Sequence, residues 1–195
     1  MKNLIFLSVV LLTGCATVLT QADIDAHDRS CDLRQQPDLA LIKGKIPLSN
    51  SEAKNVSLQM LTLDTTPTDL EKVAILRTEE LSQPCKQKSE ENRNKIAATM
   101  PELVSLASTS ASALKGNLAM LYLGKITYAQ HNGNVQVIYN KYTETATKIV
   151  SAYQQRQQAQ AQAQAFTQIY LQEILRQPTF TSCTAFGNTI NCNSR

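Results

Sequence analysis

Residues 135–170, VQVIYNKYTETATKIVSAYQQRQQAQAQAQAFTQIY, decide the fold of this chain. Mostly apolar residues recur there at alternating steps of three and four, and no proline interrupts residues 128–177. This spacing is typical of a helix with a coiled-coil seam. We therefore expect one long helix over residues 127–177. Its seam positions are Val135, Ile138, Tyr142, Thr145, Ile149, Ala152, Arg156, Ala159, Ala163, Phe166 and Tyr170.

Within this helix, residues 154–164 contain almost only Gln, Ala and Arg. Ala and Gln both favour helix, so the segment is interpreted as a polar rod, with a disordered linker as the alternative. The alanine-rich seam offers little apolar area to a partner. Apolar residues return at the far end of the helix, where Phe166, Ile169, Tyr170 and Ile174 are the expected contact residues.

Residues 21–126 are expected to form a helical body. Thr68-Asp69-Leu70-Glu71 matches a capping box, followed by a helix that buries Leu70, Val73, Ala74, Arg77 and Leu81 on one face. Pro84 predicts a break, and Pro101 predicts the start of the next helix. Aromatic residues make up only 5% of the chain and tryptophan is absent, which suits helices better than a sandwich or barrel. The predicted fold class is all-α.

Three smaller predictions concern the body. A short helix is expected over residues 52–63, stopped at Thr65-Thr66-Pro67. The small residues of 107–113 fit either a helix that others approach closely or a loop. Leu39, Leu41, Ile42 and Ile46 indicate that the connector 35–50 packs along the body.

Residues 178–195 differ in character and predict a β-hairpin tail. Gly187-Asn188 is typical of a two-residue hairpin turn, because glycine accepts a positive φ. Counting outward from this turn places Cys183 opposite Cys192 at a non-hydrogen-bonded position, with Cα atoms about 4.5 Å apart. That separation permits a disulfide.

Residues 1–14 combine Lys2, an apolar run over residues 4–12 and small residues, which is typical of a secretory signal peptide. The sequence that ends it, Leu12-Thr13-Gly14-Cys15, resembles the lipobox of bacterial lipoproteins. The resemblance implies that Cys15 carries a diacylglycerol and acyl chains such as palmitate, and that residues 15–20 form a lipidated tether. The apolar run is too short to cross a bilayer, which needs about 20 residues.

Of five cysteines, Cys15 is thus assigned to lipid, and four remain in an exported chain. An even number predicts two disulfides. The alternative, a four-thiolate zinc site, lacks the C-x₂-C spacing typical of such sites. The hairpin pairing of Cys183 with Cys192 leaves Cys31 with Cys85.

No sequence motif indicates catalysis, a cofactor or a metal. A net charge of +3 without a concentrated basic face argues against nucleic-acid binding. His131 has no flanking motif and is expected to serve packing or the surface. His27 lies among acidic residues whose helical spacing fits a solvated face better than a metal site. These acidic residues are Asp23, Asp25, Asp28 and Asp32.

The succession of a cysteine-linked helical body, Leu123 to Tyr128 opening a long helix, and a terminal cysteine hairpin resembles small helical lipoproteins of proteobacteria without an assigned activity. Ala16 after the lipidated cysteine resembles the outer-membrane class. This implies a non-enzymatic outer-membrane lipoprotein that faces the periplasm, with surface display as the alternative. We expect it to bind another envelope protein through Phe166, Tyr170, Ile174, Phe180, Phe186 and Ile190.

Two other functions compete with this expectation. A pilotin-like assembly chaperone for a secretion or pilus component would bind a partner's terminal segment in a groove between helices. A peptidoglycan-associated protein would bind the cell wall, although no known cell-wall motif is present.

Overall fold

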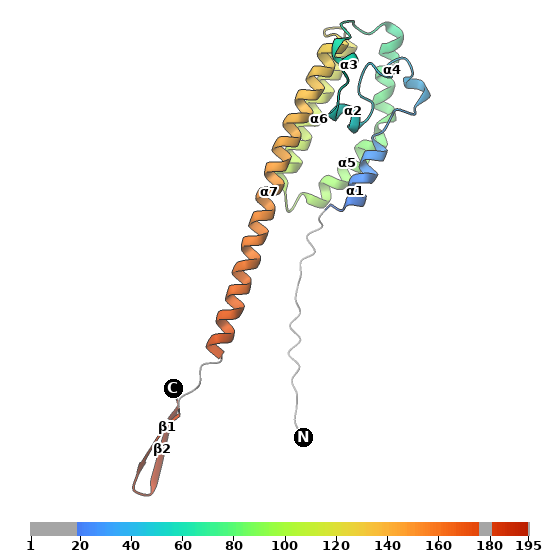
Figure 1. The fold of residues 1–195 in the computed structure, drawn as a ribbon. Coiled ribbons are helices and arrows are strands. Elements are labelled where there is room, and N and C mark those ends of the chain that lie inside the picture. Colours follow the sequence, from blue (N-terminus) through green and yellow to red (C-terminus); the bar gives the residue numbers. More distant parts are fainter. Residues whose placement is uncertain (1–18, 176–180, 195) are drawn as a thin grey trace, which may run out of the picture. The chain divides into compact units, whose positions relative to one another are not determined.

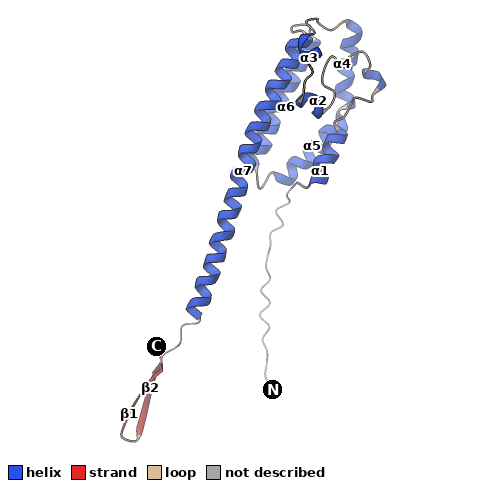
Figure 2. Cartoon of the chain, in the orientation of Figure 1, coloured by secondary structure: helices blue, strands red, loops and turns tan. Residues whose placement is uncertain are grey.

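The computed structural model describes residues 19–175 and 181–194 and is mostly helical, at 72% (Figure 1). The fold is all-α with a disulfide-linked body, one long C-terminal helix and a two-stranded hairpin, as the sequence predicts (Figure 2). It divides into two compact units, Met1–Val150 and Ser151–Arg195. The elements are α1 (Gln21–Ser30), the 3₁₀ turn η1 (Pro37–Leu39), α2 (Asn50–Lys54), α3 (Leu58–Thr62), α4 (Asp69–Leu81), α5 (Gln83–Ile96), α6 (Pro101–Tyr122), α7 (Tyr128–Leu175), β1 (Thr181–Phe186) and β2 (Thr189–Ser194).

Threonine residues begin three of the helices. At α1 and α4 the hydroxyls of Thr20 and Thr68 accept a backbone N–H, and the Asp or Glu three residues later accepts the threonine N–H in return. Thr127 does the same with Gln130 at the start of α7. Each reciprocal pair satisfies donors that a helix terminus leaves free. The capping box predicted at Thr68 is confirmed.

The prolines mark helix boundaries as predicted. Pro84 lies in the first turn of α5, and α4 ends just before it at Leu81. Pro101 is the first residue of α6, which continues without interruption through residues 107–113, so the loop alternative there does not apply. A proline in the first turn is tolerated because its missing N–H would have no partner inside the helix.

The single short helix expected over residues 52–63 is wrong. The structure has two helices there, α2 and α3, separated at Val56, whose side chain is buried. Ser57 caps α3 by accepting the Met60 N–H at 3.2 Å. Serine is favoured at such caps over helix interiors, so Ser57 indicates the start of a new helix. The spacing of apolar residues does not show this start.

The core of the body forms where the connector 35–50 packs against α4, α6 and the start of α7. Leu39 and Ile42 are fully buried there, as predicted, whereas Leu41 is exposed. The buried members of the cluster are Leu33, Leu39, Ile42, Ile46, Leu48, Ala74, Ile75, Leu121 and Tyr128.

The face of α4 predicted to be buried is confirmed only in part: Ala74 is buried and Leu81 packs against the core, but Arg77 is exposed. Leu70 and Val73 are 72% and 65% exposed, while the adjacent face, with Ile75 and Glu71, is buried. Both faces contain apolar residues, so helical spacing alone does not distinguish them. Glu71 is tolerated inside because it accepts hydrogen bonds from Lys45 Nζ and from the N–H and hydroxyl of Thr68.

Backbone and side-chain hydrogen bonds hold the start of α7 against the connector, α3 and the loop that follows α3. Tyr128 N–H donates to the Thr65 carbonyl at 2.9 Å. Asn132, which is fully buried, donates its amide hydrogens to the carbonyls of Lys45 and Met60 at 2.8 and 2.9 Å. These bonds position the first turns of the long helix within the body.

The hairpin has the predicted register. β1 and β2 are antiparallel, Phe186 pairs with Thr189, and Cys183 pairs with Cys192. Gly187 adopts a φ of +56° in the turn. The Cys183–Cys192 disulfide is present, with Cα atoms 4.0 Å apart.

Candidate functional site

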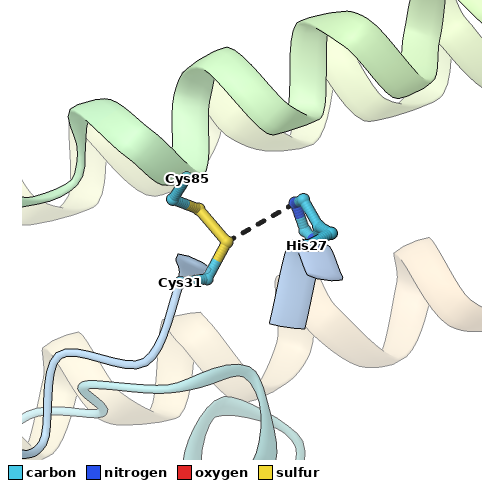
Figure 3. Close-up of side chains that lie close together, drawn as sticks. All are labelled: His27, Cys31 and Cys85. Atoms are coloured by element: carbon cyan, nitrogen blue, oxygen red, sulfur yellow. Dashed lines mark hydrogen bonds between the residues drawn. A yellow bond between two sulfur atoms is a disulfide. The ribbon is translucent and has the colours of Figure 1, made fainter. Parts of the chain in front are cut away.

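The second predicted disulfide, Cys31–Cys85, joins the end of α1 to the first turn of α5 (Figure 3). Both predicted pairings are therefore confirmed. His27 lies one helical turn before Cys31, and its Nε2 is 3.5 Å from Cys31 Sγ and 2.8 Å from Ser89 Oγ. The histidine thus contacts both the bridge and the partner helix.

His27, Cys31 and Cys85 form a group of potential metal ligands, with ligand atoms within 4.8 Å of one another. The two sulfurs are bonded to each other, so neither presents a thiolate to a metal. In this state the group is a covalent link between helices.

Polar contacts hold α1 along α5 beside the bridge. Lys95 Nζ donates to Asp23 Oδ1 at 2.5 Å, and Asn92 lies 3.5 Å from the Asp23 carbonyl. The hydrogen bond from Lys95, and then those from Thr20, lower the pKa of Asp23 below its ordinary value. Asp32 is likewise paired, and its hydrogen bond from Arg34 lowers its pKa to about 2. These aspartates hold ion pairs within the fold.

His131 is buried between α6 and α7, so its expected packing role applies. The Asn117 amide donates to His131 Nδ1 and to the His131 carbonyl, both at 2.9 Å, while Asn117 Oδ1 accepts from Asn134 at 2.9 Å. Burial lowers the pKa of His131 to about 4, so the imidazole is neutral near pH 7. No motif near His131 in the sequence predicts these hydrogen bonds.

A shallow groove of about 360 Å³ lies over this network, between α6 and the body portion of α7. Sequence reasoning did not locate it, because Met120 and Val137 lie off the predicted seam and Asn117 has no motif. Their exposure comes from the way the two helices pack. The lining residues are Ala113, Asn117, Met120, Ile126, Asn134, Val137 and Ile138.

The predicted partner-binding residues lie in the unit Ser151–Arg195. Phe180 lies outside the described residues, as does Cys15, the predicted lipidation site. The other predicted partner-binding residues are exposed, from 46% for Ile174 to 88% for Phe186. Ile169, also an expected contact residue, is exposed as well, and Leu171 adds to the exposed apolar surface at the end of α7. The remaining exposed members of the predicted set are Phe166, Tyr170 and Ile190.

None of the helices in residues 19–175 is both long and apolar enough to cross a bilayer. In comparisons with known proteins, no protein-family model, no curated protein and no solved structure matches this chain.

Proposed function

We propose that this chain is a non-enzymatic, lipid-anchored protein of the bacterial outer membrane that faces the periplasm and acts by protein–protein contacts. The unit Ser151–Arg195 is the interaction element. A partner protein of the envelope contacts the apolar end of α7 and the hairpin.

The observation that carries this proposal is the exposed apolar surface of that unit. Phe186 and Ile190, 88% and 72% exposed, lie on a disulfide-closed hairpin. Phe166 is 72% exposed near the end of α7. Burying a side chain of this size stabilises a complex by about 1.5–3 kcal/mol, and exposed apolar patches are typical of interaction surfaces.

The lipid anchor is supported by the Leu-Thr-Gly-Cys sequence at residues 12–15. Burial of acyl chains contributes roughly 0.8 kcal/mol for each CH₂, so two or more chains hold a protein stably on a membrane. Labelled palmitate is expected to enter the wild-type protein and not Cys15→Ala. Absence of label, together with membrane fractionation of Cys15→Ala, would reject the anchor.

The partner is tested by in-cell crosslinking from the hairpin followed by mass spectrometry. Phe186→Ser and Ile190→Ser are expected to reduce crosslinked partner strongly, and deletion of residues 179–195 is expected to abolish partner recovery in a pulldown after treatment of cells with a diffusible crosslinker. Thr189→Ala, at an exposed polar position of the same hairpin, serves as the matched control. Unchanged recovery in the Phe186, Ile190 and deletion variants would reject the contact.

The groove between α6 and α7 favours a second candidate function, a pilotin-like assembly chaperone. Its walls are largely apolar, and the buried Asn117 lies among its lining residues. Such a groove suits the apolar face of a partner helix. Val137→Lys would then mislocalise a secretin, whereas Lys141→Glu, at an exposed position of α7 outside the groove, would not.

A further inference from the structure

The seam of α7 within the unit Ser151–Arg195 has a pattern that specifies a partner. Seam positions in alternating steps of three and four are Arg156, Ala159, Ala163, Phe166, Tyr170 and Glu173, and all are exposed. Small residues occupy one half of this seam and aromatic residues the other. Arg156 and Glu173, at its two ends, are the charged residues of segment 151–175.

We infer that this seam binds the same seam of a second copy of the chain, with the two helices antiparallel. A two-fold axis midway between residues 164 and 165 places Ala163 opposite Phe166 of the other copy. The same axis places Ala159 opposite Tyr170, and Arg156 opposite Glu173. Each layer then joins a small side chain to a large one, or a cation to an anion.

The match between the two seams depends on the relative direction of the two helices. A parallel pair would place each seam residue against its own copy, so Arg156 would face Arg156, Glu173 would face Glu173, and alanine would face alanine at residues 159 and 163. Like charges repel, and alanine layers between bulky ones would leave gaps, which cost dispersion contacts. In the antiparallel pair, alanine opposite an aromatic ring allows the helix axes to approach to about 8 Å.

The charges are available for this role. Within the described part of the chain, neither Arg156 nor Glu173 takes part in an ion pair. The seam from residue 156 to residue 173 spans about 26 Å at 1.5 Å per residue, so it buries a short interface. Anchoring on a common membrane would raise the local concentration of copies and favour such a contact.

This inference deepens the proposed function and rests on it in treating the end of α7 as an interaction element. It reassigns Phe166 and Tyr170 of the α7 seam from the envelope partner to a second copy, while Ile174 of α7 and Phe186 and Ile190 of the hairpin remain for the envelope partner.

Charge-swap variants test the pairing by sedimentation equilibrium of the full chain in a density-matched nonionic detergent. Arg156→Glu and Glu173→Arg each place like charges in both end layers, so each should weaken dimerisation about tenfold. The double variant restores opposite charges and should dimerise like the wild type. Gln168→Glu, on the helix face opposite the seam, should have no effect.

A monomeric wild-type chain, or a double variant as weak as the single ones, would overturn the inference. Direction is tested by mixing two differently tagged full-length chains, Ala159→Cys and Tyr170→Cys, under oxidising conditions. An antiparallel pair yields mainly the disulfide that joins the Ala159→Cys chain to the Tyr170→Cys chain, which carries both tags. Disulfides joining identical chains as the main product would show a parallel pair and overturn the inference.

These outcomes separate the inference from the proposed function. A monomeric chain that still crosslinks from its hairpin to an envelope protein rejects the dimer alone. A dimer whose hairpin crosslinks to no envelope protein rejects the envelope contact alone.

Discussion

Two buried titratable residues, His131 and Glu71, are expected to make the stability of the body depend on pH. His131 is held neutral by burial, with its Nδ1 accepting the Asn117 amide 2.9 Å away. Glu71 is buried as a carboxylate. Desolvation alone would raise its pKa, but the hydrogen bonds from Lys45 and Thr68 outweigh that effect and lower it. At neutral pH the Glu71 carboxylate therefore favours the folded state, whereas the neutral His131 is tolerated there and disfavours the folded state only when the pH falls.

For His131, the folded pKa of about 4 lies below the ordinary histidine pKa of 6.5, so the unfolded state takes up the proton first as pH falls. Stability is full above about pH 6.5 and declines toward pH 4, by about 2 kcal/mol between pH 7 and pH 5. His131→Gln should remove this part of the pH dependence. Urea unfolding of both proteins at pH 7 and pH 5 measures the change in unfolding free energy. An equal change in the wild type and in His131→Gln would show that His131 is not its source.

Asn132 provides a prediction about hydrogen bonding. Asn132→Leu keeps a similar volume but leaves the Lys45 and Met60 carbonyls without their amide donor. Unsatisfied buried polar groups cost about 1–3 kcal/mol each, so we expect a loss of about 2–4 kcal/mol in the free energy of unfolding. Asn140→Leu, at an exposed position of α7, is the control and should change stability little. Equal unfolding midpoints for the two variants would contradict this role.

At the scale of elements, the Cys31–Cys85 bridge closes a loop with a sequence separation of 54. In the chain-entropy model this contributes roughly 4 kcal/mol. Cys31→Ser/Cys85→Ser should lose about that amount, while the Asp23–Lys95 pair and the His27–Ser89 hydrogen bond still hold α1 on α5. Denaturant unfolding measures the loss. Protease cleavage of the variant within α1 is measured under native conditions. Cleavage as fast as in an unfolded chain would show that those contacts do not hold α1 on α5.

Helix boundaries followed from local chemistry, and buried faces did not. Capping at Thr68 and the breaks at Pro84 and Pro101 depend on atoms within a few residues, so the sequence predicted them. The face of α4 depends on which neighbour packs against it. Leu70 and Val73 look like core residues, but the core lies on the side of Ile75.

On the scale of the whole molecule, the chain divides within α7, between Val150 and Ser151. Loss of a disulfide in one unit is expected to unfold that unit without changing the stability of the other. Cys183→Ser/Cys192→Ser removes the bridge from a two-stranded hairpin, which is marginal in water without it. The hairpin should unfold, while the unfolding midpoint of the body stays unchanged. Limited proteolysis and thermal unfolding of the same sample measure these two effects, and a lowered body midpoint would contradict the division.

The sequence by itself determined the helical class, the long helix, the hairpin register and both disulfide pairings. These depend on spacing along the chain, and the Gly187-Asn188 turn alone places Cys183 opposite Cys192. Only the tertiary structure decided which face of α4 is buried, how Asn117 and His131 meet, and that a groove lies above them. Those features arise from contacts between residues distant in the sequence, where packing selects among faces that local periodicity leaves equivalent.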